Sequence, residues 1–248
     1  MARQSSFLKL EGTIGDITFY KGRTGFKARQ KGGVSKDRIL KDPKFRRTRE
    51  NLQEFARAAN AAKFLKDAFR GIALKSSDGS LHNRLYSIAT KVIYSDTLSN
   101  RGERRFELGN IQLMKGFQFS NQSTIENTLF KQPQISDEPD SVTVTIQAMV
   151  PATYLRSLVN TTHYRISLIR ASINFVDGTY SEESVNSGEI PISMNEQEEL
   201  ALTLPKPSIP DTHHFFAMAL EYLQVLENGS KYDLYDLTQN PATILVVS

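Results

Sequence analysis

The chain has 248 residues, of which 39% are hydrophobic and 23% charged, a composition typical of a folded globular protein. It contains no cysteine, which excludes disulfides, zinc–thiolate sites and cysteine nucleophiles. The first residues lack the apolar segment of a signal peptide, and no apolar run approaches the roughly eighteen residues that a membrane span needs. We therefore expect a cytoplasmic protein with no membrane partner.

The net charge of +4 hides a sharp division of charge along the chain. Residues 1–105 hold 24 Lys and Arg against 10 Asp and Glu, a net +14, whereas residues 106–248 hold 7 against 17, a net −10. A field of this size destabilises a compact unit unless an opposite charge meets it. Two counter-charges are candidates: nucleic acid, and the acidic half of the same or a neighbouring chain.

Residues 7–31 predict a three-stranded meander with strands at 7–12, 16–21 and 26–31, and glycines at both ends of the second turn supply the backbone freedom of a tight hairpin. If Lys21 faces Phe26, then Phe19 faces Ala28 and Ile17 faces Gln30, so one side of the hairpin is mainly apolar. The other side holds Thr18, Tyr20, Lys27, Arg29 and Lys31. Tyr20 on that side either stacks on a base or shields the aliphatic stems of its basic neighbours.

Helical patterns follow the hairpin. Asp42-Pro43 marks a turn or a helix start, and from about Phe45 the apolar spacing predicts one long helix, or two helices broken near Asn60. A further helix is expected from Ser80 to Tyr94, with His82 on its polar side. A basic loop at 99–105 ends the positive half.

Beyond residue 106 the apolar pattern has a period of two, which is typical of strands. The pairs Asp177-Gly178 and Asn228-Gly229 predict hairpin turns, and a phase slip at Leu168-Ile169 predicts a β-bulge. We therefore predict two domains. Residues 1–106 form a basic α+β N-terminal region, a β-hairpin or meander plus two or three helices, and residues 107–248 form an acidic, all-β immunoglobulin-like sandwich.

No catalytic signature is present. The sequence contains no P-loop, dinucleotide fingerprint, HExxH or GxSxG motif. His213 and His214 lie in a predicted strand, where neighbours point to opposite faces, so metal ligation by that pair is not expected. The sequence predicts no enzyme, no cofactor, no metal and no small-molecule substrate.

Three stretches together resemble an uncharacterised bacterial family: GTIGDITFYK, the Gly pair after FKARQK, and DPKFRRTRENLQEF. In that family a glycine-bracketed hairpin precedes an Arg-Thr-Arg-Glu-Asn helix and a C-terminal β-domain. The resemblance covers roughly the first 75 residues. It implies the domain plan and a phage-like or mobile-element origin, but no activity and no catalytic residues.

Two classes of function fit the charge division. The first is a non-enzymatic structural protein that forms homo-oligomers, with the basic half of one copy on the acidic half of the next. The second is a nucleic-acid-binding protein that recognises phosphates without sequence preference. In a third interpretation the charges are simply solvated, and a fourth alternative is an unrecognised enzyme. Candidate contacts to nucleic acid or protein are Tyr20, Arg23, Lys27, Arg29, Lys31, Arg46, Arg47, Arg49, Arg104 and Arg105.

Overall fold

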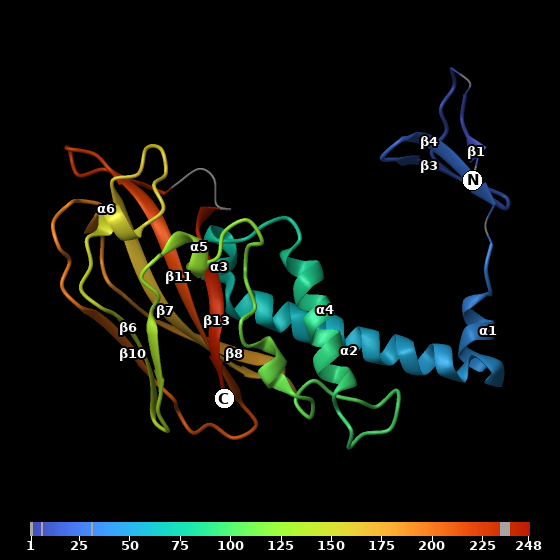
Figure 1. Ribbon diagram of the computed structural model, residues 1–248. Coiled ribbons are helices and arrows are strands. Elements are labelled where there is room, and N and C mark those ends of the chain that lie inside the picture. The colour runs from blue at the N-terminus through green and yellow to red at the C-terminus, as the bar shows by residue number, and fades with distance from the viewer. Residues whose placement is uncertain (1, 6, 31, 234–238) are drawn as a thin grey trace. The chain divides into compact units, whose positions relative to one another are not determined.

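A computed structural model describes residues 2–5, 7–30, 32–233 and 239–248 (Figure 1). The chain forms two compact units, residues 1–50 (unit 1) and residues 51–248 (unit 2). The change of charge near residue 106 falls inside unit 2. No helix among the described residues is both long enough and apolar enough to cross a membrane.

Unit 1 begins with a four-stranded antiparallel sheet. Its strands lie in the order β1 (Ala2–Arg3), β4 (Gly25–Gln30), β3 (Ile17–Gly22) and β2 (Gly12–Ile14). The β3–β4 register confirms the predicted hairpin: Lys21 lies opposite Phe26, Phe19 opposite Ala28 and Ile17 opposite Gln30. The two-residue turn between Gly22 and Gly25 is also confirmed, and Gly25 has φ +104°, which glycine adopts without strain.

The predicted first strand at 7–12 is wrong. The strand that pairs with β3 is only Gly12–Ile14, and residues 7–11 form part of a loop. The side chain of Gln4 accepts from the backbone N–H of Leu10 and donates to its carbonyl, so both backbone groups of Leu10 are bonded outside the sheet. A residue whose backbone groups are already used cannot join the ladder.

Two short helices and the start of a long one complete unit 1. Ser35 caps α1 (Lys36–Lys41), and Asp42 caps the 3-10 helix η1 (Pro43–Phe45), which confirms the helix start expected at Asp42-Pro43. Helix α2 (Arg46–Ala68) continues into unit 2 without a break at Asn60. It ends at Ala68, and Phe69 is the N-cap residue of α3 (Arg70–Lys75).

The helices of unit 2 pack on a six-stranded antiparallel sheet. Helix α4 (Leu81–Tyr94) has the predicted extent, and its His82 is exposed as expected. The sheet order is β12 (Lys231–Asp233), β11 (His213–Val225), β7 (His163–Asn174) and β8 (Thr179–Asn186), with β13 (Ala242–Val247) on β11 and β9 (Ile190–Pro191) on β7. Both hairpin turns predicted at Asp177-Gly178 and Asn228-Gly229 are present.

A second, three-stranded sheet covers the opposite face. Its order is β10 (Leu200–Pro205), β6 (Ser141–Ile146) and β5 (Gln134–Asp137). The connections contain the short helices η2 (Ile111–Met114), α5 (Ile125–Thr128) and α6 (Pro151–Tyr154). The sheet-rich, sandwich-like C-terminal region is therefore confirmed, whereas its immunoglobulin-like type is not.

Both faces of the central strands β7 and β11 are buried, whereas β8 and β12 are largely exposed. On β11, Phe215 belongs to the core shared with the helices, and its neighbour Phe216 belongs to the core between the two sheets. On β7, Leu168 and Ile169 divide in the same way. The β7–β11 register runs through this point without a shift, so the predicted bulge at Leu168-Ile169 is wrong. Alternate apolar residues of these strands therefore pack into two different cores, one on each face of the sheet.

Candidate partner-binding surfaces

The polar face of the unit 1 sheet brings three predicted site residues together. Tyr20 lies directly opposite Lys27, and Arg29 lies on the same face. The Arg29 guanidinium carbon is 5.7 Å from the centre of the Tyr20 ring, in a cation–π contact. Arg23 is exposed in the hairpin turn. Lys31, the fifth candidate in this region, lies outside the described residues.

The opposite face of this sheet is apolar and poorly covered. It presents Ile14, Ile17, Phe19, Phe26 and Ala28, and the first two are exposed. Among the described residues of unit 1, only Glu50 is buried, and it lies in α2 rather than in the sheet. An apolar sheet face normally packs against another layer. The unit 1 sheet thus has one apolar and one polar face, as a sheet with one buried face does, but no core packs against its apolar face within the described residues of unit 1.

The three arginines at the start of α2 have different roles. Arg46 and Arg47 are largely exposed, and each donates at 3.0 Å to Glu50. Burial raises the pKa of Glu50, but the hydrogen bonds from Arg47 and Arg46 outweigh it and leave that pKa below its usual value. Arg49 donates to the carbonyls of Ile39 (2.7 Å) and Asp42 (2.9 Å), so it holds the end of α1.

Arg104 and Arg105 belong to unit 2 and lie in a loop anchored on α2. Glu54 is buried and accepts from the backbone N–H of Gly102 at 2.7 Å, while Arg57 donates to the carbonyls of Gly102 (2.6 Å) and Arg104 (3.3 Å). The Arg104 Nε lies 4.0 Å from a Glu54 oxygen, so this side chain faces inward. Arg105 is exposed. Its guanidinium lies 3.8 Å from a Glu107 oxygen, and of the two arginines it is the more exposed to solvent.

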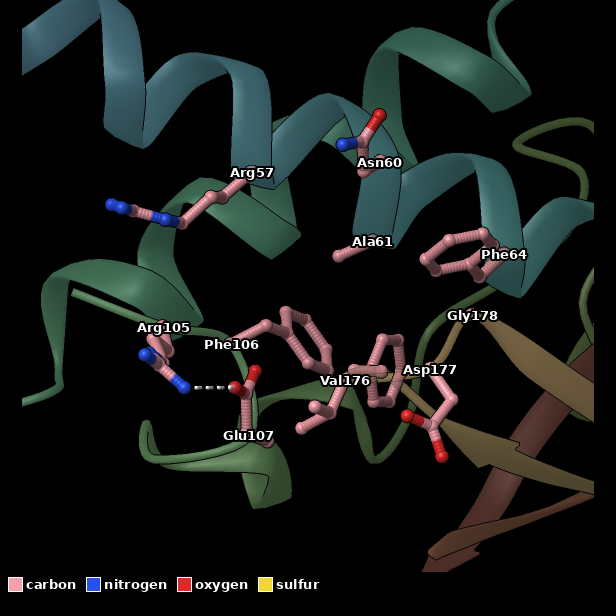
Figure 2. A pocket seen from close by; sticks show the side chains of 11 residues that line it. Arg57, Asn60, Ala61, Phe64, Arg105, Phe106, Glu107, Val176, Asp177 and Gly178 are labelled. Carbon is pink, nitrogen blue, oxygen red and sulfur yellow. Dashed lines mark ion pairs between the residues drawn. The ribbon is translucent and has the colours of Figure 1, made fainter. Parts of the chain in front are cut away.

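A pocket of about 320 Å³ lies beside this loop in unit 2 (Figure 2). Helix α2 forms one wall, and the segment from Arg105 to Glu107 and the β7–β8 turn form the other. The lining residues are Arg57, Asn60, Ala61, Phe64, Arg105, Phe106, Glu107, Phe175, Val176, Asp177 and Gly178. The rings of Phe106 and Phe175 are 4.3 Å apart, so the interior is aromatic. The sequence gives no sign of this pocket, because its walls come from three segments that are far apart along the chain.

The histidine pair behaves as the strand pattern predicts. His213 pairs with Ile173 and His214 with Ser172, so their rings lie on opposite faces of the sheet. The Nδ1 atom of His214 is 2.8 Å from the Ser172 hydroxyl, and burial lowers the pKa of both histidines. Among the described residues there is no group of three or more His, Asp or Glu side chains that could hold a metal ion.

Comparison with known proteins adds no functional assignment. The chain matches no family model, no curated protein and no solved structure. The resemblance noted in the first 75 residues is therefore not supported by a family match.

Proposed function

We propose that this chain is a non-enzymatic structural protein that assembles with copies of itself through unit 1. The observation that carries the proposal is the unit 1 sheet, which has one apolar face and one basic face but no buried residue in any of its strands. Burying the apolar face against a neighbouring copy supplies the second layer that such a sheet requires. A phage-like or mobile-element origin, a cytoplasmic location and an immunoglobulin-like type of sandwich are part of this proposal.

Charge favours the acidic half of a second copy as the partner of unit 1. Unit 1 holds 14 Lys and Arg against 5 Asp and Glu, a net +9, and residues 106–248 carry a net −10. A basic surface that meets an acidic one is steered into contact and discriminates against like-charged partners. Because the two surfaces differ, the contact is heterologous, and repeated contacts of this kind build rings or filaments.

The experiment compares the full chain with Ile17→Ser, which makes the apolar face polar. Ile17 is 45% exposed, so its replacement removes little packing within unit 1. Val159→Ser is the matched control, an exposed valine in a loop of unit 2. We expect light scattering to show smaller assemblies for Ile17→Ser and unchanged assemblies for Val159→Ser. Assemblies of the same size in all three proteins would contradict the use of this face.

Nucleic acid is the second candidate partner, favoured by the exposed guanidinium groups of Arg46 and Arg47. If they contact phosphates, binding to DNA of mixed sequence weakens with salt, with a log–log slope near −0.9 per phosphate neutralised. The double variant Arg46→Gln, Arg47→Gln should then bind less tightly and show a slope smaller by about two. Arg49 is left intact because it holds α1, and Lys63→Gln on the exposed side of α2 is the control. No binding at low salt would reject this candidate.

A further inference from the structure

A small polar pocket lies in unit 2 between α3 and the six-stranded sheet. Its volume is about 180 Å³, which is below the range of pockets that hold drug-sized ligands, so it suits only a small molecule. Strands β7, β8 and β11 line it from the sheet, and Gly71, Ile72 and Lys75 line it from α3. Four segments that are far apart along the chain therefore meet here.

The register of β7 and β8 turns polar side chains toward this pocket. Glu182 lies opposite Ala171, and Ser184 lies opposite Ile169. Ala171 and Ile169 belong to the core that the helices cover, so Glu182 and Ser184 share that face of the sheet. Ser167, two residues before Ile169 on β7, shares it as well. Polar groups thus replace apolar ones on this part of the face.

The two cationic side chains of the pocket are already bonded to carboxylates. Lys75 donates to Oε2 of Glu221 at 2.9 Å, and a guanidinium nitrogen of Arg165 lies 3.6 Å from the same oxygen. Arg165 also donates to Glu189, which Lys231 contacts at 3.0 Å. Hydrogen bonds from Lys231 and Arg165 lower the pKa of Glu189 to about 2. The cations of the pocket are therefore neutralised within the chain.

The hydrogen-bond acceptors of the pocket, by contrast, have free capacity. Both contacts to Glu221 use Oε2, so its Oε1 has no partner within the described residues. Glu182 and the hydroxyls of Ser167 and Ser184 also have no hydrogen bond or ion pair within that part of the chain. Ser167 is only 9% exposed, and a buried hydroxyl normally has a partner. The pocket thus offers acceptors to a ligand that donates.

Gly71 leaves room for a donor beside Glu182. A Cβ atom added at Gly71 would lie 3.4 Å from Oε1 of Glu182 and 3.9 Å from its Oε2. The φ of Gly71 is not positive, and glycine within a helix costs about 1 kcal/mol relative to alanine, so the backbone does not require a glycine here. Partial burial raises the pKa of Glu182 above its ordinary value. A cation beside this carboxylate would offset that effect.

We propose that this pocket binds a small molecule through a protonated primary amine, with Glu182, Glu221 and Ser167 as the acceptors. An ammonium group has three N–H donors, which suits three side chains that only lack a donor. Hydrogen bonds between an ammonium group and a carboxylate are roughly twice as strong as neutral ones. All the lining residues belong to unit 2, so this site goes beyond the proposed self-assembly and does not depend on it.

Saturation-transfer NMR with the full chain tests the site through the signals of the ligand. The probe is ethanolamine, a small primary amine. Tetramethylammonium is one control, because it carries the same charge without an N–H donor, and ethylene glycol is the other, because a hydroxyl replaces the amine. We expect a saturable signal for ethanolamine and none for either control.

Variants of the chain assign this signal to the pocket. Glu182→Gln keeps the shape of the side chain but removes its charge, and should raise the Kd of ethanolamine roughly tenfold, the loss of one charge-assisted hydrogen bond. Gly71→Ala should raise it too, because the methyl group takes the space beside Glu182, while alanine favours the helix. Glu198→Gln, at an exposed position in a loop of unit 2, is the control and should leave the Kd unchanged.

The same Kd in Glu182→Gln or Gly71→Ala as in the unmodified chain would overturn the proposal, and so would the absence of saturable binding. Tetramethylammonium that competes equally with ethanolamine would show that the site senses charge alone. Calcium chloride that displaces ethanolamine, where sodium chloride of equal ionic strength does not, would assign the pocket to a metal ion instead. Because the ligand signals report on single chains and assemblies alike, failure of this site leaves the proposed self-assembly standing.

Discussion

Asp96 anchors the loop that runs from α4 to the pocket. It follows α4 directly, and its side chain accepts from the backbone N–H groups of Leu98 (2.9 Å), Ser99 (3.0 Å) and Arg105 (3.0 Å). Asp96 is only 1% exposed. Burial raises its pKa, but the hydrogen bonds from Ser99, Arg105 and Leu98 outweigh burial and lower the pKa of Asp96 from 3.8 to about 2. The ionised carboxylate therefore stabilises the folded chain.

The size of this stabilisation follows from the pKa shift. A fall of roughly two pKa units is equivalent to about 2.5 kcal/mol in the free energy of unfolding at neutral pH. Asp96→Asn removes the charge and one of the two acceptor oxygens, so we expect a loss of similar size. For a unit of this length, that loss lowers the melting temperature by roughly 5–10 °C.

Thermal unfolding followed by circular dichroism at pH 7 and pH 3 tests this expectation. Because the folded-state pKa is depressed, the stabilisation is fully present above the unfolded value of 3.8 and is lost as the pH falls through about 2. The difference between the chain and Asp96→Asn should thus fall by about half between pH 7 and pH 3. Asp140→Asn, at an exposed position, is the control. A melting temperature unchanged by Asp96→Asn at pH 7, or a difference as large at pH 3 as at pH 7, would show that the ionised Asp96 does not stabilise the fold.

Two further predictions concern packing and chain organisation. Gly109→Ala should destabilise unit 2 by several kcal/mol, since its Cβ would lie 2.1 Å from the Val92 carbonyl oxygen, whereas Gly79→Ala, with nothing within 4 Å, should be close to neutral in the same melting experiment. Limited proteolysis with a low-specificity protease should cut first at residues 32–35, the exposed connection between β4 and α1, and only later at residues 99–105, which are bonded to buried carboxylates. An early cut at residues 100–105 would instead support the domain boundary expected from the charge division.

The sequence predicted correctly those elements that depend on residues close together along the chain. The hairpin register follows from the two glycines around its turn, and α4 follows from its helical spacing, because neighbours in sequence decide both. The sequence did not reveal that helices cover one face of the six-stranded sheet. The change of phase at Leu168-Ile169 therefore suggested a bulge, although each residue simply faces a different core.

Side-chain bonds between distant segments explain the remaining differences. The loop at 7–11 was predicted as a strand because nothing in its composition shows that Gln4 occupies the backbone groups of Leu10. Arg49 was predicted as a partner contact because the sequence does not show that its guanidinium is bonded to the carbonyls at the end of α1. Such long-range contacts are visible only when the segments are placed in space.

We infer that the chain assembles with copies of itself through charged and apolar contacts of unit 1. Sedimentation velocity of the full chain, over a wide range of protein concentration at low salt and at about half-molar salt, tests it most directly. Salt at that strength screens exposed charges over a few ångströms. We predict a mass above that of one chain at low salt, which rises with protein concentration and falls when salt is added. A single-chain mass at every concentration and every salt would contradict the account.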